Sequence, residues 1–174
     1  QDLRITAQLI DARTDVHLWA EKYKGTLDDI FDIQERVSRE IVDALKLKLS
    51  TKEKQKIAER PIDDVQAFEC YLKAQHEICS WTKEGLDRAL EYLKSGLDIV
   101  GENALIYSAM GYAYWQYINI GARTYQEFAH KVEACVDKIF KLEPESPHGY
   151  MLLARLVLFK GDTKGQVRYL LKVL

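Results

Sequence analysis

The residue types that most often carry chemistry lie far apart in this sequence, and no two histidines stand at an i, i+4 spacing. His76 and Cys79 form the nearest metal-like pair, but a surface histidine beside a buried cysteine explains their i, i+3 spacing better than a metal site. The acid pairs Asp28-Asp29 and Asp63-Asp64 precede expected helices, where capping and the helix dipole explain them. We therefore predict no catalytic residue, no metal site and no cofactor.

Motifs that cradle nucleotides or expose a nucleophile do not occur either. The sequence contains no G-x-G-x-x-G, no G-x-x-x-x-G-K and no G-x-S-x-G. We expect that this chain is not itself an enzyme, whatever catalytic domain accompanies it in a longer protein.

Charge and composition disfavour nucleic acid and a membrane as partners. A formal net charge of -2 over 174 residues supplies no basic field for nucleic acid, and no apolar run reaches the roughly 18 residues of a membrane span. The basic stretch from residue 46 to 60 is diluted by Glu53 and Glu59, so a solvated helix face explains it better than a phosphate site. Three cysteines without a C-x-x-C spacing predict free thiols in a reducing compartment, and hence a cytoplasmic location.

The elements that must position any site begin with a predicted β-hairpin. Residues 3–10 alternate between apolar and polar types, residues 11–15 form a polar turn, and residues 16–23 alternate again. A two-stranded hairpin is marginal in water, so it must pack on a helix or pair with further strands.

A long amphipathic helix follows the hairpin. Thr26 is the expected cap, and apolar residues recur at three- and four-residue steps from Ile30 to Leu49. A short basic helix then runs to Arg60, and Pro61 ends it. Asp63 or Asp64 caps the next helix.

The remainder predicts three pairs of helices separated by short polar or glycine-containing breaks. The expected pairs are 65–79 with 83–100, 103–118 with 125–142, and 147–159 with 163–174.

The pairs share an internal pattern that resembles the tetratricopeptide repeat. The middle pair reads Tyr107-x-x-Met110-Gly111-x-x-Tyr114, and the third reads Tyr150-x-x-Leu153-Ala154-x-x-Val157. A small residue between large ones lets two helices approach closely. The first pair matches least well, with Ala74 at the small position and Cys70 where an aromatic residue is expected. Gly111 and Ala154 lie nine residues further apart than one 34-residue repeat, which predicts longer helices or an inserted loop in the middle pair.

The N-terminal third resembles the last hairpin and helix of a bacterial TolB-like domain. The resemblance rests on residues 3–12, on His17-Leu18-Trp19-Ala20-Glu21 and on Asp29-Ile30-Phe31-Asp32-Ile33-Gln34. It implies a regulatory segment of a multidomain signalling protein, in which an adenylate/guanylate cyclase, a kinase or a winged-helix regulator precedes this module. Most of the TolB-like sheet is missing, so the hairpin edge is expected to pair with a second copy as a homodimer.

Together these patterns predict a mainly α fold: a tetratricopeptide-like solenoid of antiparallel helix pairs, preceded by a β-hairpin and a long helix. Residues 1–60 form the TolB-like remnant, and residues 61–174 form about three repeats, the last truncated. The abrupt start and end indicate a piece excised from a longer protein.

Stacked repeats expose one face of their first helices along a groove, which is the candidate site for a protein or peptide partner. The residues expected there are Tyr71, Gln75, Ser108, Tyr112, Trp115 and Arg155. The competing interpretation is that the inserted loop or the N-terminal helix covers Tyr112 and Trp115. The predicted function is binding of a peptide, helix or sister domain; the alternative is a dimerisation or spacer element that regulates an attached cyclase or kinase domain.

Overall fold

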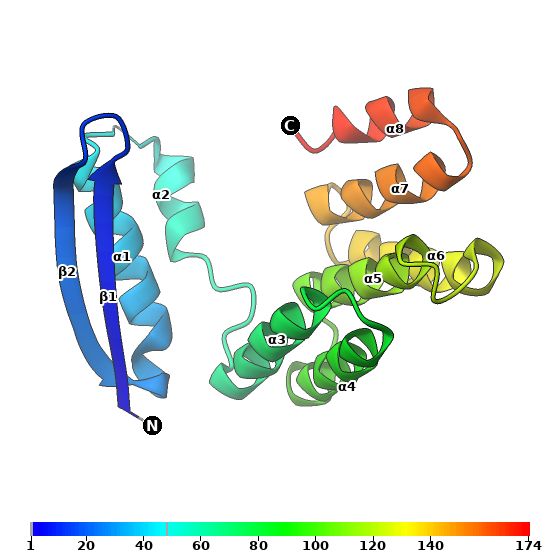
Figure 1. The fold of residues 1–174 in the computed structure, drawn as a ribbon, viewed down its shortest axis with the longest axis horizontal. Helices are drawn as coiled ribbons and strands as arrows, with labels where there is room; N and C mark the ends of the chain where they lie inside the picture. Colours follow the sequence, from blue (N-terminus) through cyan, green and yellow to red (C-terminus); the bar gives the residue numbers. More distant parts are fainter. Residues whose placement is uncertain (1, 48) are drawn as a thin grey trace. The chain divides into compact units, whose positions relative to one another are not determined.

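A computed structural model describes residues 2–47 and 49–174, without the side chains of Leu27, Lys52 and Lys56 (Figure 1). Lys48, part of the predicted basic stretch, and Gln1 lie outside the described residues. The chain divides into two units, Gln1–Arg60 and Pro61–Leu174. The prediction of a mainly helical chain with an N-terminal two-stranded sheet is confirmed.

The first unit opens with an antiparallel hairpin of β1 (Asp2–Asp11) and β2 (Val16–Thr26). The second strand is three residues longer than predicted, because its last residues continue to pair with the start of β1, down to Thr26 opposite Asp2. Alternate side chains of β1 are covered, as the period of two predicts.

The helix α1 (Ile30–Ala44) packs against β2 and supplies the core of this unit (Figure 1). Phe31 and Ile33 of α1 are buried together with Tyr23 of β2. The Tyr23 hydroxyl donates a hydrogen bond to the Glu40 carboxylate, and burial together with this carboxylate raises the pKa of Tyr23 to about 12. The hairpin is therefore held to the helix by both apolar and polar contacts.

The start of α1 differs from the prediction that the Thr26 side chain caps the helix. A short 3-10 helix, Leu27–Asp29, comes first, and Asp29 Oδ2 accepts hydrogen bonds from the Thr26 backbone N–H at 2.7 Å and its hydroxyl at 2.9 Å. The threonine therefore donates, because the carboxylate is the stronger acceptor. These bonds lower the pKa of Asp29.

The end of α1 also differs, since the helix stops at Ala44 and not at Leu49. Lys46 takes a positive φ of 54°, and the Leu47 N–H donates to the Val42 carbonyl at 3.1 Å. This is the bond pattern of a left-handed helix terminus, which turns the chain away from the helix axis. The next helix, α2, is Thr51–Ala58.

The second unit consists of three consecutive helix pairs, each packed side by side and joined by a short loop (Figure 1). They are α3 (Val65–Ile78) with α4 (Lys83–Val100), α5 (Ala104–Asn119) with α6 (Tyr125–Leu142), and α7 (Pro147–Phe159) with α8 (Thr163–Leu170). The second helix of each of the first two pairs packs on the first helix of the next pair. The final helix stops at Leu170, four residues before its predicted end.

Local hydrogen bonds fix where these helices begin and end. Asp64, not Asp63, caps α3, and its carboxylate accepts from the backbone N–H groups of Gln66 and Ala67 at 2.9 Å each. Thr124 and Glu127 form a reciprocal capping box at the start of α6. The three breaks at Gly101, Gly121 and Gly161 have φ values of 76°, 71° and 73°, which glycine adopts without strain.

The small residues of the repeated pattern lie at tight helix contacts. Ala154 is 2% exposed, and Gly111 is buried where α5 meets α6 and α7. A Cβ at Gly111 would stand 3.2 Å from the Cys135 Cβ and 2.5 Å from Leu152 Cδ1. Relative to the first pair, the middle pair has a longer first helix and a longer loop after it, whereas α6 is as long as α4. Among the described residues no helix is both long and apolar enough to cross a membrane.

Candidate functional site

One face of the second unit carries a groove formed by the first helix of every pair. Its lining residues recur at steps of three or four along each helix, so they share a face. They are Tyr71 and Gln75 of α3, Leu105, Ser108, Ala109 and Tyr112 of α5, and His148, Met151 and Arg155 of α7. Five of the six predicted groove residues thus line one surface.

The buried side of the same helices explains why most of these residues face outward. Ala74, Gly111 and Ala154 are buried against neighbouring helices. Each stands next in sequence to a lining residue, Gln75, Tyr112 or Arg155. Close packing on one side of each helix therefore determines which residues line the groove.

Arg155 is held in the groove by aromatic rings. Its guanidinium carbon lies 4.7 Å from the ring centre of Tyr112 and 5.4 Å from that of Trp115. The two rings are themselves stacked, with centroids 5.6 Å apart and planes inclined by 15°. Such cation–π contacts hold an arginine in place without neutralising it.

The charge of Arg155 is not matched within the part of the chain that the structure describes, since no carboxylate there lies within 4.0 Å of its nitrogens. The side chain is half-buried, and this burial lowers the pKa of Arg155. A partly desolvated cation gains from a hydrogen-bonded anionic partner. The groove lining includes His148 as well, but no acidic residue.

Trp115 is the predicted site residue that does not line the groove. It stacks on Tyr112 and packs against Phe159 of α7, with ring centroids 6.1 Å apart. Its indole Nε1 is buried and has no hydrogen-bond partner within the described part of the chain. Trp115 is half-buried and supports Tyr112 and Arg155, whereas Tyr112 lines the groove.

Four lining residues were not predicted from the sequence: Leu105, Ala109, His148 and Met151. They stand three, four or seven residues from Tyr112 and Arg155, so the same helical period indicates them once the register is known.

Tyr71, which was predicted, stacks on Phe68 with ring centroids 6.2 Å apart. Burial raises the pKa of Tyr71, so its hydroxyl is a protonated donor at neutral pH.

The thiols and histidines do not gather around this groove or elsewhere in the described residues, where no group of three or more His, Cys, Asp or Glu side chains could hold a metal ion. Cys79 is exposed, so the prediction of a buried cysteine beside His76 is wrong, whereas Cys135 is buried. Burial raises the pKa of Cys135 to about 12, which leaves it a poor nucleophile.

No family model matches this chain. The chain is 36% identical over 97 residues to "Putative adenylate cyclase 3" of Rhizobium meliloti (strain 1021). The alignment covers 56% of this chain and 16% of that protein. The chain is therefore similar to a small part of a much longer protein, which is named as an adenylate cyclase.

Proposed function

We propose that this chain is a non-catalytic interaction module of a bacterial signalling protein, and that its groove binds a peptide, a helix or a sister domain. The observation that carries this proposal is the groove shared by α3, α5 and α7, with Arg155 stacked on Tyr112 and without an acidic partner among the residues that the structure describes. Aromatic residues and arginine are the types that contribute most to protein interfaces.

The proposed architecture of the second unit is a tetratricopeptide-type stack. Burial of Gly111 and Ala154 at helix contacts supports it, as does the packing of each pair on the next. For the first unit we propose the hairpin and helix of a TolB-like domain. The α1–β2 packing supports this, because the matched sequence strings fall on those elements.

The groove suggests how a partner is recognised. Arg155 has its guanidinium free to donate to a carboxylate or to a helix C-terminal carbonyl of the partner. Leu105 and Met151 offer apolar surface beside it. The partner segment is thus expected to carry an acceptor flanked by an apolar side chain. We propose a cytoplasmic protein as the partner, and neither nucleic acid nor a membrane.

The test uses a photo-crosslinking residue at position 108 of the intact parent protein, expressed in its own cells. We expect it to trap a partner or sister domain, and Arg155→Glu to reduce the trapped product at least about tenfold, as for a central interface arginine. Arg168→Glu is the matched control, because Arg168 is an exposed arginine on α8, outside the groove. Equal trapping in both variants would reject the groove as the binding surface.

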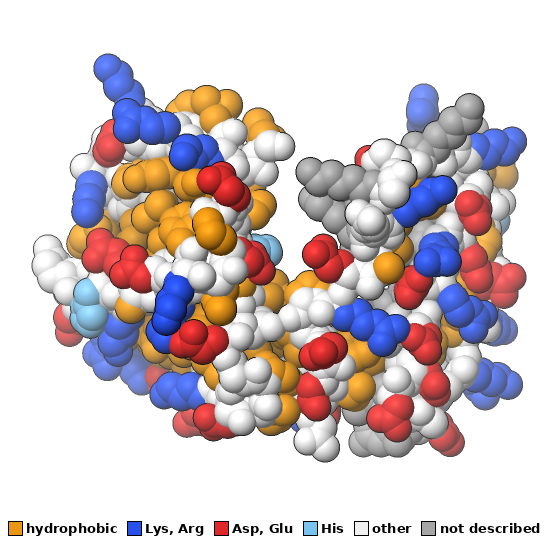
Figure 2. All heavy atoms as spheres, turned by 180° about the vertical axis from the view of Figure 1, so that it is seen from behind, with side chains coloured by type: hydrophobic (Ala, Val, Ile, Leu, Met, Phe, Trp, Pro, Cys, Tyr) orange, Lys and Arg blue, Asp and Glu red, His pale blue; other side chains and the backbone are white. Residues whose placement is uncertain are grey.

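A second candidate is a dimerisation or spacer element that regulates an attached adenylate/guanylate cyclase or kinase domain. The name of the relative favours it. Apolar side chains exposed on the last pair favour it as well; they are Leu158, Phe159, Val167, Leu170 and Leu171. Figure 2 shows apolar groups on the surface of the second unit. The hairpin, which pairs with no other strand among the described residues, is a second candidate dimer contact.

Light scattering on the purified chain separates the two candidates. A dimer that Leu171→Lys or a charge at Leu18 of β2 converts to a monomer supports association between copies. A monomer at high micromolar concentration rejects association between copies and leaves the groove as the interaction surface.

A further inference from the structure

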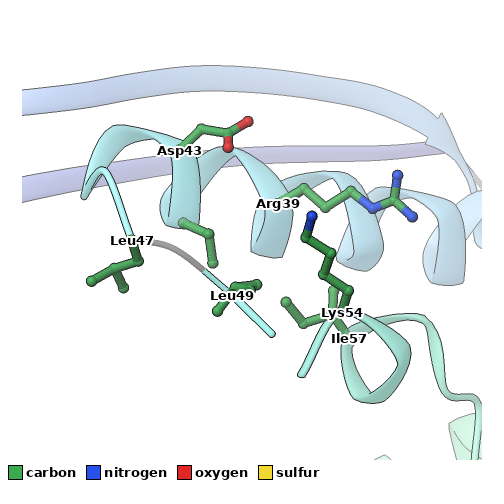
Figure 3. A pocket seen from close by; sticks show the side chains of 7 residues that line it. Arg39, Asp43, Leu47, Leu49, Lys54 and Ile57 are labelled. Carbon is green, nitrogen blue, oxygen red and sulfur yellow. The ribbon is translucent and has the colours of Figure 1, made fainter. Parts of the chain in front are cut away.

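The first unit has a hollow of its own, between the end of α1 and α2 (Figure 3). Its cavity volume is about 640 Å³, within the range of sites that hold small molecules. The lining residues are Arg39, Val42, Asp43, Leu47, Leu49, Lys54 and Ile57.

The terminus of α1 builds one wall. Because Lys46 adopts a left-handed conformation, the Leu47 N–H reaches back to the Val42 carbonyl. Helix ends of this kind commonly bring an apolar residue after the turn against one in the last helical turn. Leu47 and Val42 accordingly line the same hollow, although Leu47 remains 55% exposed. An apolar surface is thus held open at a turn whose backbone is hydrogen-bonded.

The helix α2 builds the other wall. Its start is fixed by Ser50 and Glu53, since the Glu53 carboxylate accepts from the Ser50 N–H at 2.8 Å and from its hydroxyl at 2.7 Å. Lys54 and Ile57 stand three residues apart, on one face of the helix that follows. Both contribute to the lining.

Charge distinguishes one end of the hollow. Figure 3 shows the Lys54 ammonium directed toward the Arg39 side chain, whereas the Asp43 carboxylate points away from it. Arg39 forms an ion pair with Glu35. Lys54 has no carboxylate within 4.0 Å among the described residues. The apolar lining is entirely aliphatic, without an aromatic plane for a flat ring to stack on.

We infer that this hollow binds a free single-chain amphiphile, with an alkyl chain along Val42, Leu47, Leu49 and Ile57 and an anionic head at Lys54 and Arg39. Aliphatic walls favour an alkyl chain through burial of apolar area. Lys54, which has no carboxylate within 4.0 Å in the described part of the chain, selects a carboxylate or phosphate head over a cationic one, and Arg39 lies beside it. This site lies within residues 39–57 and is independent of the groove in the second unit.

The experiment titrates the whole chain with laurate below its micelle concentration, using calorimetry and methyl NMR. We expect saturable binding with shifts confined to the methyl groups of Val42, Leu47, Leu49 and Ile57. Dodecyltrimethylammonium, with the same chain length and the opposite charge, is expected to bind at least about tenfold more weakly. Equal binding of the two probes would overturn the inference.

Two variants localise the head group. Lys54→Glu is expected to weaken laurate binding about five- to tenfold, as for reversal of an exposed charge next to an anion. The matched control Lys24→Glu, an exposed lysine on β2, is expected to leave it unchanged. Circular dichroism verifies that both variants keep their helices. Loss of affinity in both, or in neither, counts against the site.

A last arm separates a free amphiphile from a membrane. Vesicles of phosphatidylglycerol are expected not to co-sediment the chain, because the hollow is a local site and not an extended basic face. Vesicle binding that Lys54→Glu abolishes, without laurate binding, would replace this inference by a membrane contact. Binding of an acidic peptide at the same methyl groups in place of laurate would also refute it.

Discussion

Replacing Gly111 by alanine tests the packing on which the second unit and its groove depend. Gly111 lies in the middle of α5, where alanine improves helix propensity by about 1 kcal/mol. The new Cβ, however, would stand 2.5 Å from Leu152 Cδ1, and Leu152 is 1% exposed, so this side chain has no free space to move into. Packing and propensity therefore act in opposite directions.

The magnitude follows from these two effects. Overpacking a close contact in a core costs about 1–3 kcal/mol. After the gain in propensity, a net loss of about 1 kcal/mol in the free energy of unfolding remains, with an upper limit of about 2 kcal/mol. Urea unfolding followed by circular dichroism and tryptophan fluorescence resolves a shift of this size when the m-value is unchanged.

Gly96→Ala is the matched control, because Gly96 is also buried within a helix of the same unit. Its nearest neighbour would be Ile106 Cδ1 at 3.3 Å, the end of a flexible side chain. This variant is expected to be as stable as the parent, or more stable by up to about 1 kcal/mol. Combining Gly111→Ala with Leu152→Val removes the clashing methyl, so the double variant should lose less than the sum of the single changes. A Gly111→Ala protein at least as stable as the parent would refute the close approach of α5 and α7.

Further changes probe individual contacts. Asp64→Ala removes the acceptor of two backbone N–H groups and should cost about 1 kcal/mol, measured by urea unfolding. Lys46→Gly relieves a left-handed lysine and should stabilise the first unit by about 1 kcal/mol, measured by amide exchange in α1. At pH 8 a thiol reagent should modify Cys79 at once and Cys135 only after unfolding, because burial raises the pKa of Cys135 to about 12; rapid reaction of Cys135 in the native chain would contradict its burial.

The helix pairs could be predicted to within a few residues because the signals that delimit them are local. Thr82 and Asn103 each cap a helix by accepting from a backbone N–H three residues ahead. Gly101 supplies a positive φ at the intervening break. Such interactions involve neighbours in sequence, so they are visible in the sequence without knowledge of the fold.

The end of α1 could not be predicted in this way. Leu45, Leu47 and Leu49 continue an apolar pattern compatible with a longer helix, and lysine is not the residue expected at a left-handed terminus. The turn at Lys46 brings Leu47 beside Val42, an arrangement that the periodicity does not indicate. The hollow next to α2 follows from this turn, which is why it was absent from the predicted sites.

The different positions of Tyr112 and Trp115 could not be predicted from the sequence, for another reason. Tyr112 and Trp115 stand three residues apart on α5, so the helical period places both on nearly the same face. What separates them is Phe159, which comes from α7 and packs on Trp115. The contact between α5 and α7 therefore decides that the tyrosine lines the groove while the tryptophan supports it.

This division of roles also affects the geometry of the groove. Arg155 is placed by two rings of the preceding pair, so its position depends on how α7 packs on α5, and that packing depends on the small residue at Gly111. A change at the helix contact thus moves the cation relative to Tyr71 and Gln75 on α3 without touching any lining residue. The groove is formed by the stack of pairs, and no single pair contains it.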